Sequence, residues 1–111
     1  MKFRPILKKE NNMKNKKELK LDEFRKNKTT GHPVHIYAKV GDEFKHIGIT
    51  HSKVTQGIKN IKMEKNPDPK DDKPSYFKPK AEHQSTNKYG ERKAGWKLSE
   101  IDKEKMKPYR K

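Results

Sequence analysis

The stretch VHIYAKVGDEFKHIGIT at residues 34–50 decides the fold that the sequence predicts. Apolar and polar side chains alternate on both sides of Gly41-Asp42, which is the pattern of β-strands with one buried face. A glycine at the first position of a two-residue connection suits a type II′ turn, and such a turn fixes the register of the strands. In that register the facing pairs are Val34 with Ile49, Ile36 with Ile47, and Ala38 with Lys45. The stretch therefore predicts an antiparallel hairpin with one apolar face.

The opposite face of this hairpin carries aromatic, imidazole and ammonium groups. Its members are His35, Tyr37, Lys39, Phe44 and His46. We expect this face to be in contact with solvent. Exposed rings on a small sheet can stack on unpaired bases, and Tyr37 is the best candidate for that contact.

Two further strands are expected after the hairpin. Residues 58–65 predict a third strand with its apolar side chains facing inward. Residues 75–78 predict a short fourth strand that Pro79 ends, because proline lacks the N–H that a sheet requires. Residues 80–95 show no period of either kind, so we expect a loop there.

The C-terminal part of the chain predicts one helix. Ser99 is its expected N-cap, with Asp102 at the capping-box position, and the helix stops before Pro108. Trp96 is expected to anchor this helix to the sheet. The fold class is therefore α+β, with a small antiparallel sheet of three to four strands, a C-terminal helix and a flexible basic N-terminal arm.

The charge is concentrated outside the centre of the chain. Residues 1–31 carry 11 basic and 4 acidic side chains, whereas residues 32–79 carry 9 and 6. We expect three parts, namely a basic arm over residues 1–30, a small α+β domain over residues 31–107 and a basic tail over residues 108–111. A short helix over residues 17–28 is the alternative to a mobile arm.

Composition excludes several classes of protein. The 111 residues are 41% charged and 27% hydrophobic, and no segment approaches the roughly 20 apolar residues that span a bilayer. No secretory signal is recognisable, so a cytoplasmic location is expected. There is no cysteine, and the spacing of the five histidines does not indicate a metal site. We expect neither a metal nor a cofactor, and no membrane partner.

The formal net charge of +15 predicts a polyanionic partner. Lysine outnumbers arginine 26 to 4, which favours contacts with phosphates over reading of guanine edges. Codon usage in an AT-rich genome is the alternative source of the lysine excess. The expected partner is nucleic acid, preferably RNA. The expected nucleic-acid-binding residues are Tyr37, Lys39, Lys53, Lys59, Lys62, Tyr76 and Lys78.

Two histidines are candidates for chemistry. An imidazole can give or take a proton near neutral pH, and RNA cleavage without a metal needs a base for the 2′-hydroxyl and an acid for the leaving oxygen. His46 and His51 supply these groups around one strand end, beside Thr50, Ser52 and Lys53. The alternative is that both histidines are exposed on a binding face and do no chemistry.

Four short segments carry a resemblance to a known class. They are GHP at 31–33, IGITHS at 47–52, NIKMEKNPDP at 60–69 and PSY at 74–76. Residues 31–79 resemble short proteins of bacterial mobile elements and the phage-associated branch of the barnase–EndoU–colicin–RelE nuclease class. The resemblance implies a small basic α+β fold that cleaves RNA without a metal, with His46 or His51 and Ser75 at active-site positions.

Three functions are consistent with these features. The first is an RNA-binding protein that uses lysine–phosphate contacts and the aromatic and histidine face of the hairpin. The second is a metal-independent endoribonuclease, such as a toxin, with His46, His51 and Ser75 as its catalytic residues. The third is an interaction protein that docks on an acidic protein, such as an antitoxin. We favour the first, because the charge excess is the strongest signal.

Overall fold

The computed structural model describes residues 19–110, which form a bent antiparallel sheet with one helix packed against it. The sheet has six strands in the order β6-β7-β3-β2-β1-β8, so the expectation of three to four strands is wrong. These strands are β1 (Glu23–Asn27), β2 (Pro33–Val40), β3 (Glu43–Thr50), β6 (Ile61–Lys62), β7 (Tyr76–Ser85) and β8 (Tyr89–Arg92). A separate hairpin consists of β4 (Val54–Thr55) and β5 (Ile58–Lys59). The helical segments are η1 (Thr86–Lys88), α2 (Glu100–Met106) and η2 (Lys107–Tyr109).

The central hairpin of β2 and β3 is confirmed at its tip and differs at its base. Gly41 has a φ of 61° and Asp42 does not have a positive φ, as a type II′ turn requires. Ala38 pairs with Lys45 as expected, but a bulge at Tyr37 then shifts the register, so that Ile36 pairs with His46. A shift of one residue turns a side chain to the other face of a strand. The apolar and imidazole side chains of the hairpin are therefore mixed on both faces.

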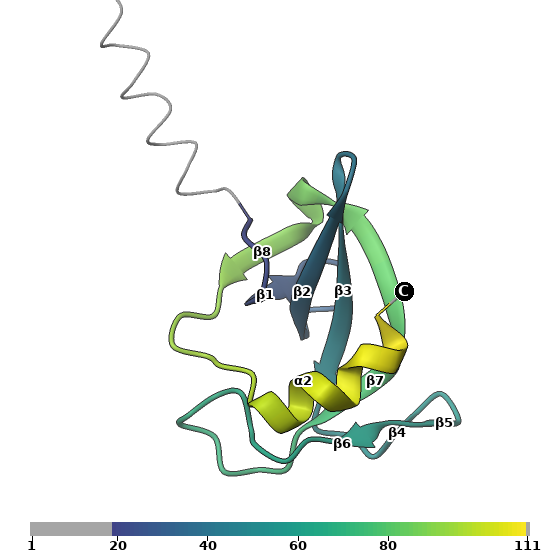
Figure 1. Ribbon diagram of the computed structural model, residues 1–111, viewed down its shortest axis with the longest axis vertical. Helices are drawn as coiled ribbons and strands as arrows, with labels where there is room; N and C mark the ends of the chain where they lie inside the picture. The colour runs from purple at the N-terminus through teal and green to yellow at the C-terminus, as the bar shows by residue number, and fades with distance from the viewer. Residues whose placement is uncertain (1–18, 111) are drawn as a thin grey trace, which may run out of the picture.

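Each face of the hairpin is buried in its own core. One core contains Phe24, Ile47, Ile49, Met63, Phe77 and Met106. The other contains Leu19, Val34, Ile36, Phe44 and Tyr89. Figure 1 shows α2 crossing the sheet at one end of β3 and β7. His35 and His46 are 0% and 2% exposed, so the expectation of a wet histidine face is wrong.

Strand β1 corrects the predicted arm. It pairs with β2 on one side and with β8 on the other, so part of the expected arm over residues 1–30 lies inside the sheet as a strand and not as a helix. Phe24 is buried, and Arg25 and Glu23 are buried together because their side chains form an ion pair of 2.8 Å. Residues 1–18 of the expected arm lie outside the described residues.

Strand β7 corrects the predicted loop over residues 80–95. It runs through Pro79 to Ser85, and β8 follows after η1. The ladder between β3 and β7 is interrupted between Ile47 and Ile49, which places Pro79 at a bulge where no N–H is needed. The expected third strand over residues 58–65 is divided, since β5 pairs with β4 and β6 pairs with β7.

The C-terminal helix is confirmed. Ser99 accepts a hydrogen bond from the Asp102 N–H at 3.1 Å and donates one to the Asp102 carboxylate at 2.8 Å. The same buried carboxylate accepts hydrogen bonds from the backbone N–H groups of Glu64 and Lys65, at 2.7 and 3.1 Å. Asp102 thus fixes the loop after β6 to α2.

The segments on either side of α2 also pack on the sheet. Trp96 packs against Phe24 with ring centroids 5.6 Å apart, in agreement with the anchoring role expected for it. Tyr109 packs against Phe77, so η2 continues the fold into the segment expected to be a basic tail. None of the helices within residues 19–110 is long and apolar enough to cross a membrane.

Candidate functional site

A cleft of about 170 Å³ opens where β2 begins and β3 ends. Its polar lining residues are His32, Thr50, His51, Ser52, Asn66, Asp71 and Ser75, and Trp96 adds an aromatic ring. A larger depression of about 580 Å³ shares Asn66 and Asp71 with it. Two of the three predicted catalytic residues, His51 and Ser75, therefore line one cavity.

His51 and Asp71 form the closest contact in this cleft. The His51 Nε2 atom is 2.7 Å from the Asp71 Oδ2 atom. The backbone N–H of Lys73 donates to the Asp71 carboxylate at 2.9 Å, and this bond and the His51 contact lower the pKa of Asp71. An ionised carboxylate only accepts hydrogen bonds, so His51 Nε2 is the donor. The neutral ring then carries its lone pair on Nδ1, and the side chain is 54% exposed.

The loop over residues 66–73 holds Asp71 at the end of β3. Asn66 donates from Nδ2 to the carbonyl oxygen of Lys73 at 2.8 Å, and its Oδ1 accepts from the Asp68 N–H at 2.9 Å. Short polar side chains that bond to the backbone two residues on are typical of tight turns. The Asn-Pro-Asp-Pro sequence predicts only a chain break, but the loop that it begins supplies Asn66 and Asp71 to the cleft.

Ser75 and His32 each lie directly before a strand, Ser75 before β7 and His32 before β2. Ser75 is 4% exposed, and its carbonyl oxygen accepts from the Met63 N–H at 2.9 Å. His32 is exposed just before β2, and its backbone N–H donates to Thr30. His32 lies directly before β2, and Val34 of that strand pairs with Gly48 near the end of β3. Both imidazoles of the cleft therefore extend from neighbouring strand ends.

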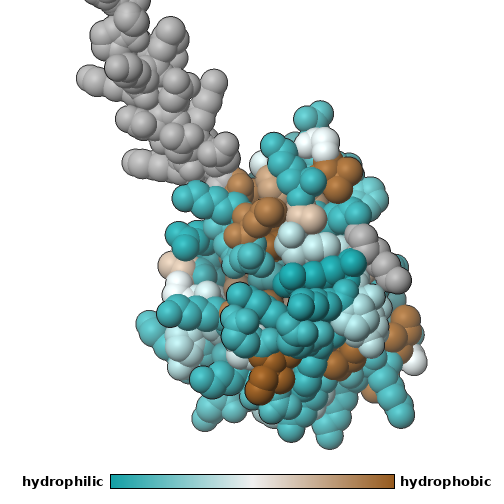
Figure 2. Space-filling model, viewed as in Figure 1, coloured by the Kyte–Doolittle hydropathy of each residue, from teal (hydrophilic) through white to brown (hydrophobic). Residues whose placement is uncertain are grey.

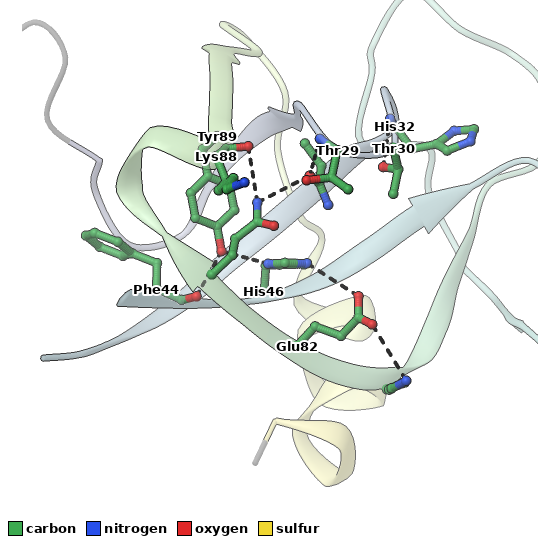
Figure 3. A network of polar contacts seen from close by, with 11 residues as sticks. Thr29, Thr30, His32, Phe44, His46, Glu82, Lys88 and Tyr89 are labelled. Atoms are coloured by element: carbon green, nitrogen blue, oxygen red, sulfur yellow. Dashed lines mark hydrogen bonds and ion pairs between the residues drawn. The ribbon is translucent and has the colours of Figure 1, made fainter. Parts of the chain in front are cut away.

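His46 lies in the core and does not line this cleft. Its Nδ1 is 2.7 Å from the Tyr89 hydroxyl, which donates to the carbonyl oxygen of Phe44 at 2.8 Å, so His46 Nδ1 carries the proton (Figure 3). Its Nε2 faces the Glu82 carboxylate at 3.7 Å. Burial lowers the pKa of His46, and the Glu82 charge opposes that change. His46 also lies roughly 13 Å along β3 from Thr50, at about 3.3 Å per residue.

The predicted nucleic-acid-binding residues fall into two groups. Lys53, Lys59 and Lys62 are exposed around the β4–β5 hairpin and β6, and Lys78 is half-buried on β7. Lys39 is exposed near the hairpin tip at the other end of β3, with its Nζ 5.8 Å from the centre of the Phe44 ring.

The two predicted tyrosines are not open to base stacking. Tyr76 is 8% exposed. Tyr37 is half-buried against the core, with the Arg110 guanidinium 5.5 Å from its ring centre. The aromatic side chain that lines the cleft is Trp96.

Sequence reasoning missed Asp71, Asn66 and the position of His32. Asp71 lies in a loop without any period, and only its place in a polar turn sequence could have drawn attention to it. No three acidic or histidine side chains within residues 19–110 come together as a group that could hold a metal ion.

No family model, no curated protein and no solved structure matches this chain. The resemblance to the nuclease class therefore stays a prediction, and the cleft has to be interpreted from its own chemistry.

Proposed function

We propose that this protein binds RNA through the lysines beside the cleft. The observation that carries the proposal is the absence of any acidic residue from residue 44 to residue 63. Lys53, Lys59 and Lys62 lie within this acid-free segment, and all three are exposed. Within residues 19–110 none of the three forms an ion pair, and such ammonium groups attract phosphates and release their counterions on contact.

Hydrogen bonds connect the acid-free segment to the cleft. The Asn60 side chain donates to the carbonyl oxygen of Ser52, which lines the cleft, and the Asn60 N–H donates to the carbonyl oxygen of Lys53. Lys62 pairs with Tyr76, next to Ser75. A phosphate chain that follows the lysines is therefore led past the imidazoles and Trp96. A narrow cleft with one aromatic ring suits a single unpaired nucleotide better than a duplex.

The lysines of α2 and at the start of η2 provide a contrast. Lys103 is 3.3 Å from Glu100, and Lys107 is 2.7 Å from Glu104, so ion pairs with the helix's own residues offset their charges. The face that α2 crosses is mostly hydrophilic, with only scattered hydrophobic groups, which suits a polar partner (Figure 2). Ammonium groups that form no ion pair are thus available to a ligand around β4, β5 and β6.

The test is a salt titration of binding to single-stranded RNA of roughly 12 nucleotides. A variant with Lys53→Gln, Lys59→Gln and Lys62→Gln should lower the affinity at low salt. It should also reduce the slope of log K against log salt by about 2, at roughly 0.7 for each lost phosphate contact.

The matched control changes the net charge equally with Lys88→Gln, Lys103→Gln and Lys107→Gln. This control variant should retain most of the slope of log K against log salt. If both variants lost the same affinity and the same slope, binding would not depend on a local surface, and the proposal would be contradicted. Failure of the unchanged protein to bind RNA at low salt, together with binding to polyglutamate, would favour an acidic protein as the partner.

A further inference from the structure

We propose that the cleft also cleaves RNA, by transfer of a phosphate from the 5′-oxygen to the neighbouring 2′-oxygen. This inference rests on the proposed RNA binding and assigns a reaction to the same site. It is carried by the His51–Asp71 contact in the cleft and by the second imidazole, His32, from the adjacent strand end.

His51 is the base in this reaction. Its Nε2 is held by Asp71, so the neutral ring has a free lone pair on Nδ1, and about half of the side chain is open to a ligand. Binding alone does not need this arrangement, because a phosphate is held by any cation. A fixed tautomer with one free nitrogen is what proton abstraction requires.

Asp71 is a positioning residue. It does not need to contact RNA, since its carboxylate orients the His51 ring and stabilises the imidazolium that forms. The hydrogen bond from the Lys73 N–H and the Asn66 turn fix the carboxylate in place. Asp71 and His32 are the titratable groups that line the cleft with His51, and Lys53 follows close in sequence.

His32 is the acid. It lies just before β2 and lines the same cleft as His51, so the two imidazoles border the space in which one phosphate group would bind. The hydroxyl groups of Thr50 and Ser75 also line the cavity and can donate to the non-bridging oxygens.

The reaction balances without an added reagent. His51 Nδ1 takes the 2′-hydroxyl proton, and the 2′-oxygen forms a bond to phosphorus. The bond from phosphorus to the 5′-oxygen breaks, and protonated His32 gives its proton to that oxygen. The products are a 2′,3′-cyclic phosphate and a 5′-hydroxyl end, with His51 protonated and His32 neutral.

The test follows cleavage of single-stranded RNA in EDTA by the full chain. His51→Ala and His32→Ala should each lower the rate by about 10²–10⁴-fold, the usual contribution of a general base or acid. The control is His83→Ala, because His83 is also an exposed histidine in contact with a carboxylate, that of Glu43, outside the cleft. This variant should cleave at the unchanged rate.

Binding to 2′-O-methyl RNA separates this inference from the proposed function. That RNA lacks the nucleophile, so it should bind with unchanged affinity and stay intact. Binding without cleavage of ordinary RNA would overturn the reaction and leave the binding proposal standing. Loss of both would overturn both. Cleavage that His51→Ala leaves unchanged would also overturn the reaction.

The role of Asp71 is tested by comparing the cleavage rate with binding. Asp71→Asn should lower the rate, because an amide can donate to His51 Nε2 and so permits the other tautomer of the ring. Its affinity for 2′-O-methyl RNA should stay unchanged. An unchanged rate in a variant that folds normally would contradict the positioning role.

Discussion

His46 and His51 lie five positions apart on and just after β3, and each faces an acidic side chain, yet their surroundings differ completely. His46 is 2% exposed and uses Nδ1 to bond a buried tyrosine, whereas His51 is 54% exposed and keeps one nitrogen free. An acidic partner alone therefore does not decide the role of a histidine. Solvent access and a free nitrogen decide whether the ring can do chemistry.

His35 belongs with His46 in the buried class. Its side chain is 0% exposed, and neither ring nitrogen has a hydrogen-bond partner. Its ring packs on Phe24 at 4.9 Å, and burial lowers its pKa to about 4, with the Arg110 charge contributing in the same direction. His35 and His46 are therefore structural residues of the core, whereas His51 lies in the cleft and is available to a ligand.

The largest effect on stability is expected from His46→Ala. It should lower the free energy of unfolding by about 3 kcal/mol, because it opens a cavity in the core and removes the hydrogen bond to Tyr89. Urea denaturation measures this loss. His46→Asn should recover part of it, since its amide N–H can replace Nδ1–H. A loss in the free energy of unfolding of less than about 0.5 kcal/mol, as for a typical surface substitution, would contradict a structural role for His46.

Acid should destabilise the protein before its carboxylates titrate. The folded-state pKa of His35 is about 4 and an unfolded histidine titrates near 6.5, so the unfolded chain binds more protons in between and stability falls as pH falls. The expected loss from pH 7 to pH 5 is about 2 kcal/mol. Denaturation at both pH values measures it. His35→Leu should remove this contribution, while His46, whose pKa burial also lowers, still contributes in the same direction. An equal loss in that variant would rule out His35 as a source.

Tyr89→Phe should have a smaller effect, of about 1 kcal/mol. The change removes one hydroxyl that accepts from His46 and donates to the carbonyl oxygen of Phe44, while the ring still fills the core. Urea denaturation measures the loss, and Tyr109→Phe on η2 is the control for removal of a tyrosine hydroxyl. A neutral Tyr89→Phe would show that the contact with His46 contributes nothing to stability.

The smallest effect on stability is expected from His51→Ala. An exposed side chain outside the core should change the free energy of unfolding by less than about 0.5 kcal/mol. The thermal midpoint of unfolding checks this value. A large loss would place His51 with His46 in the structural class and would remove the contrast between the two residues.

The sequence predicted local features better than their surroundings. The Gly41-Asp42 turn and the Ser99 cap are encoded within a few residues, and both are confirmed. The bulge at Tyr37 has no local signature, so the alternation of the hairpin predicted the wrong face for His46. Strand β1 was missed because Glu23 and Arg25 are charged, and contacts with each other and with residues of β8 compensate for their burial.

The candidate site was also predictable only where the signal is local in the sequence. His51 and Ser75 stand out by residue type, and the structure places both on one cavity. Asp71 reaches His51 only because the turn at Asn66 folds the loop back toward β3. Contacts of that kind depend on tertiary structure, and no pattern along the chain reveals them.

The pairing of β1 with β8 also affects how the chain reaches this structure. Arg25 of β1 lies opposite Arg92 of β8. The second edge of β1 is therefore covered only when β8, which lies more than 60 residues later in the chain, has joined the sheet. Contacts between segments so distant in sequence slow the search for the native state. During synthesis, β1 leaves the ribosome long before β8 exists. Until then the backbone groups along the outer edge of β1 can pair with another extended chain. They become unavailable once β8 pairs with β1.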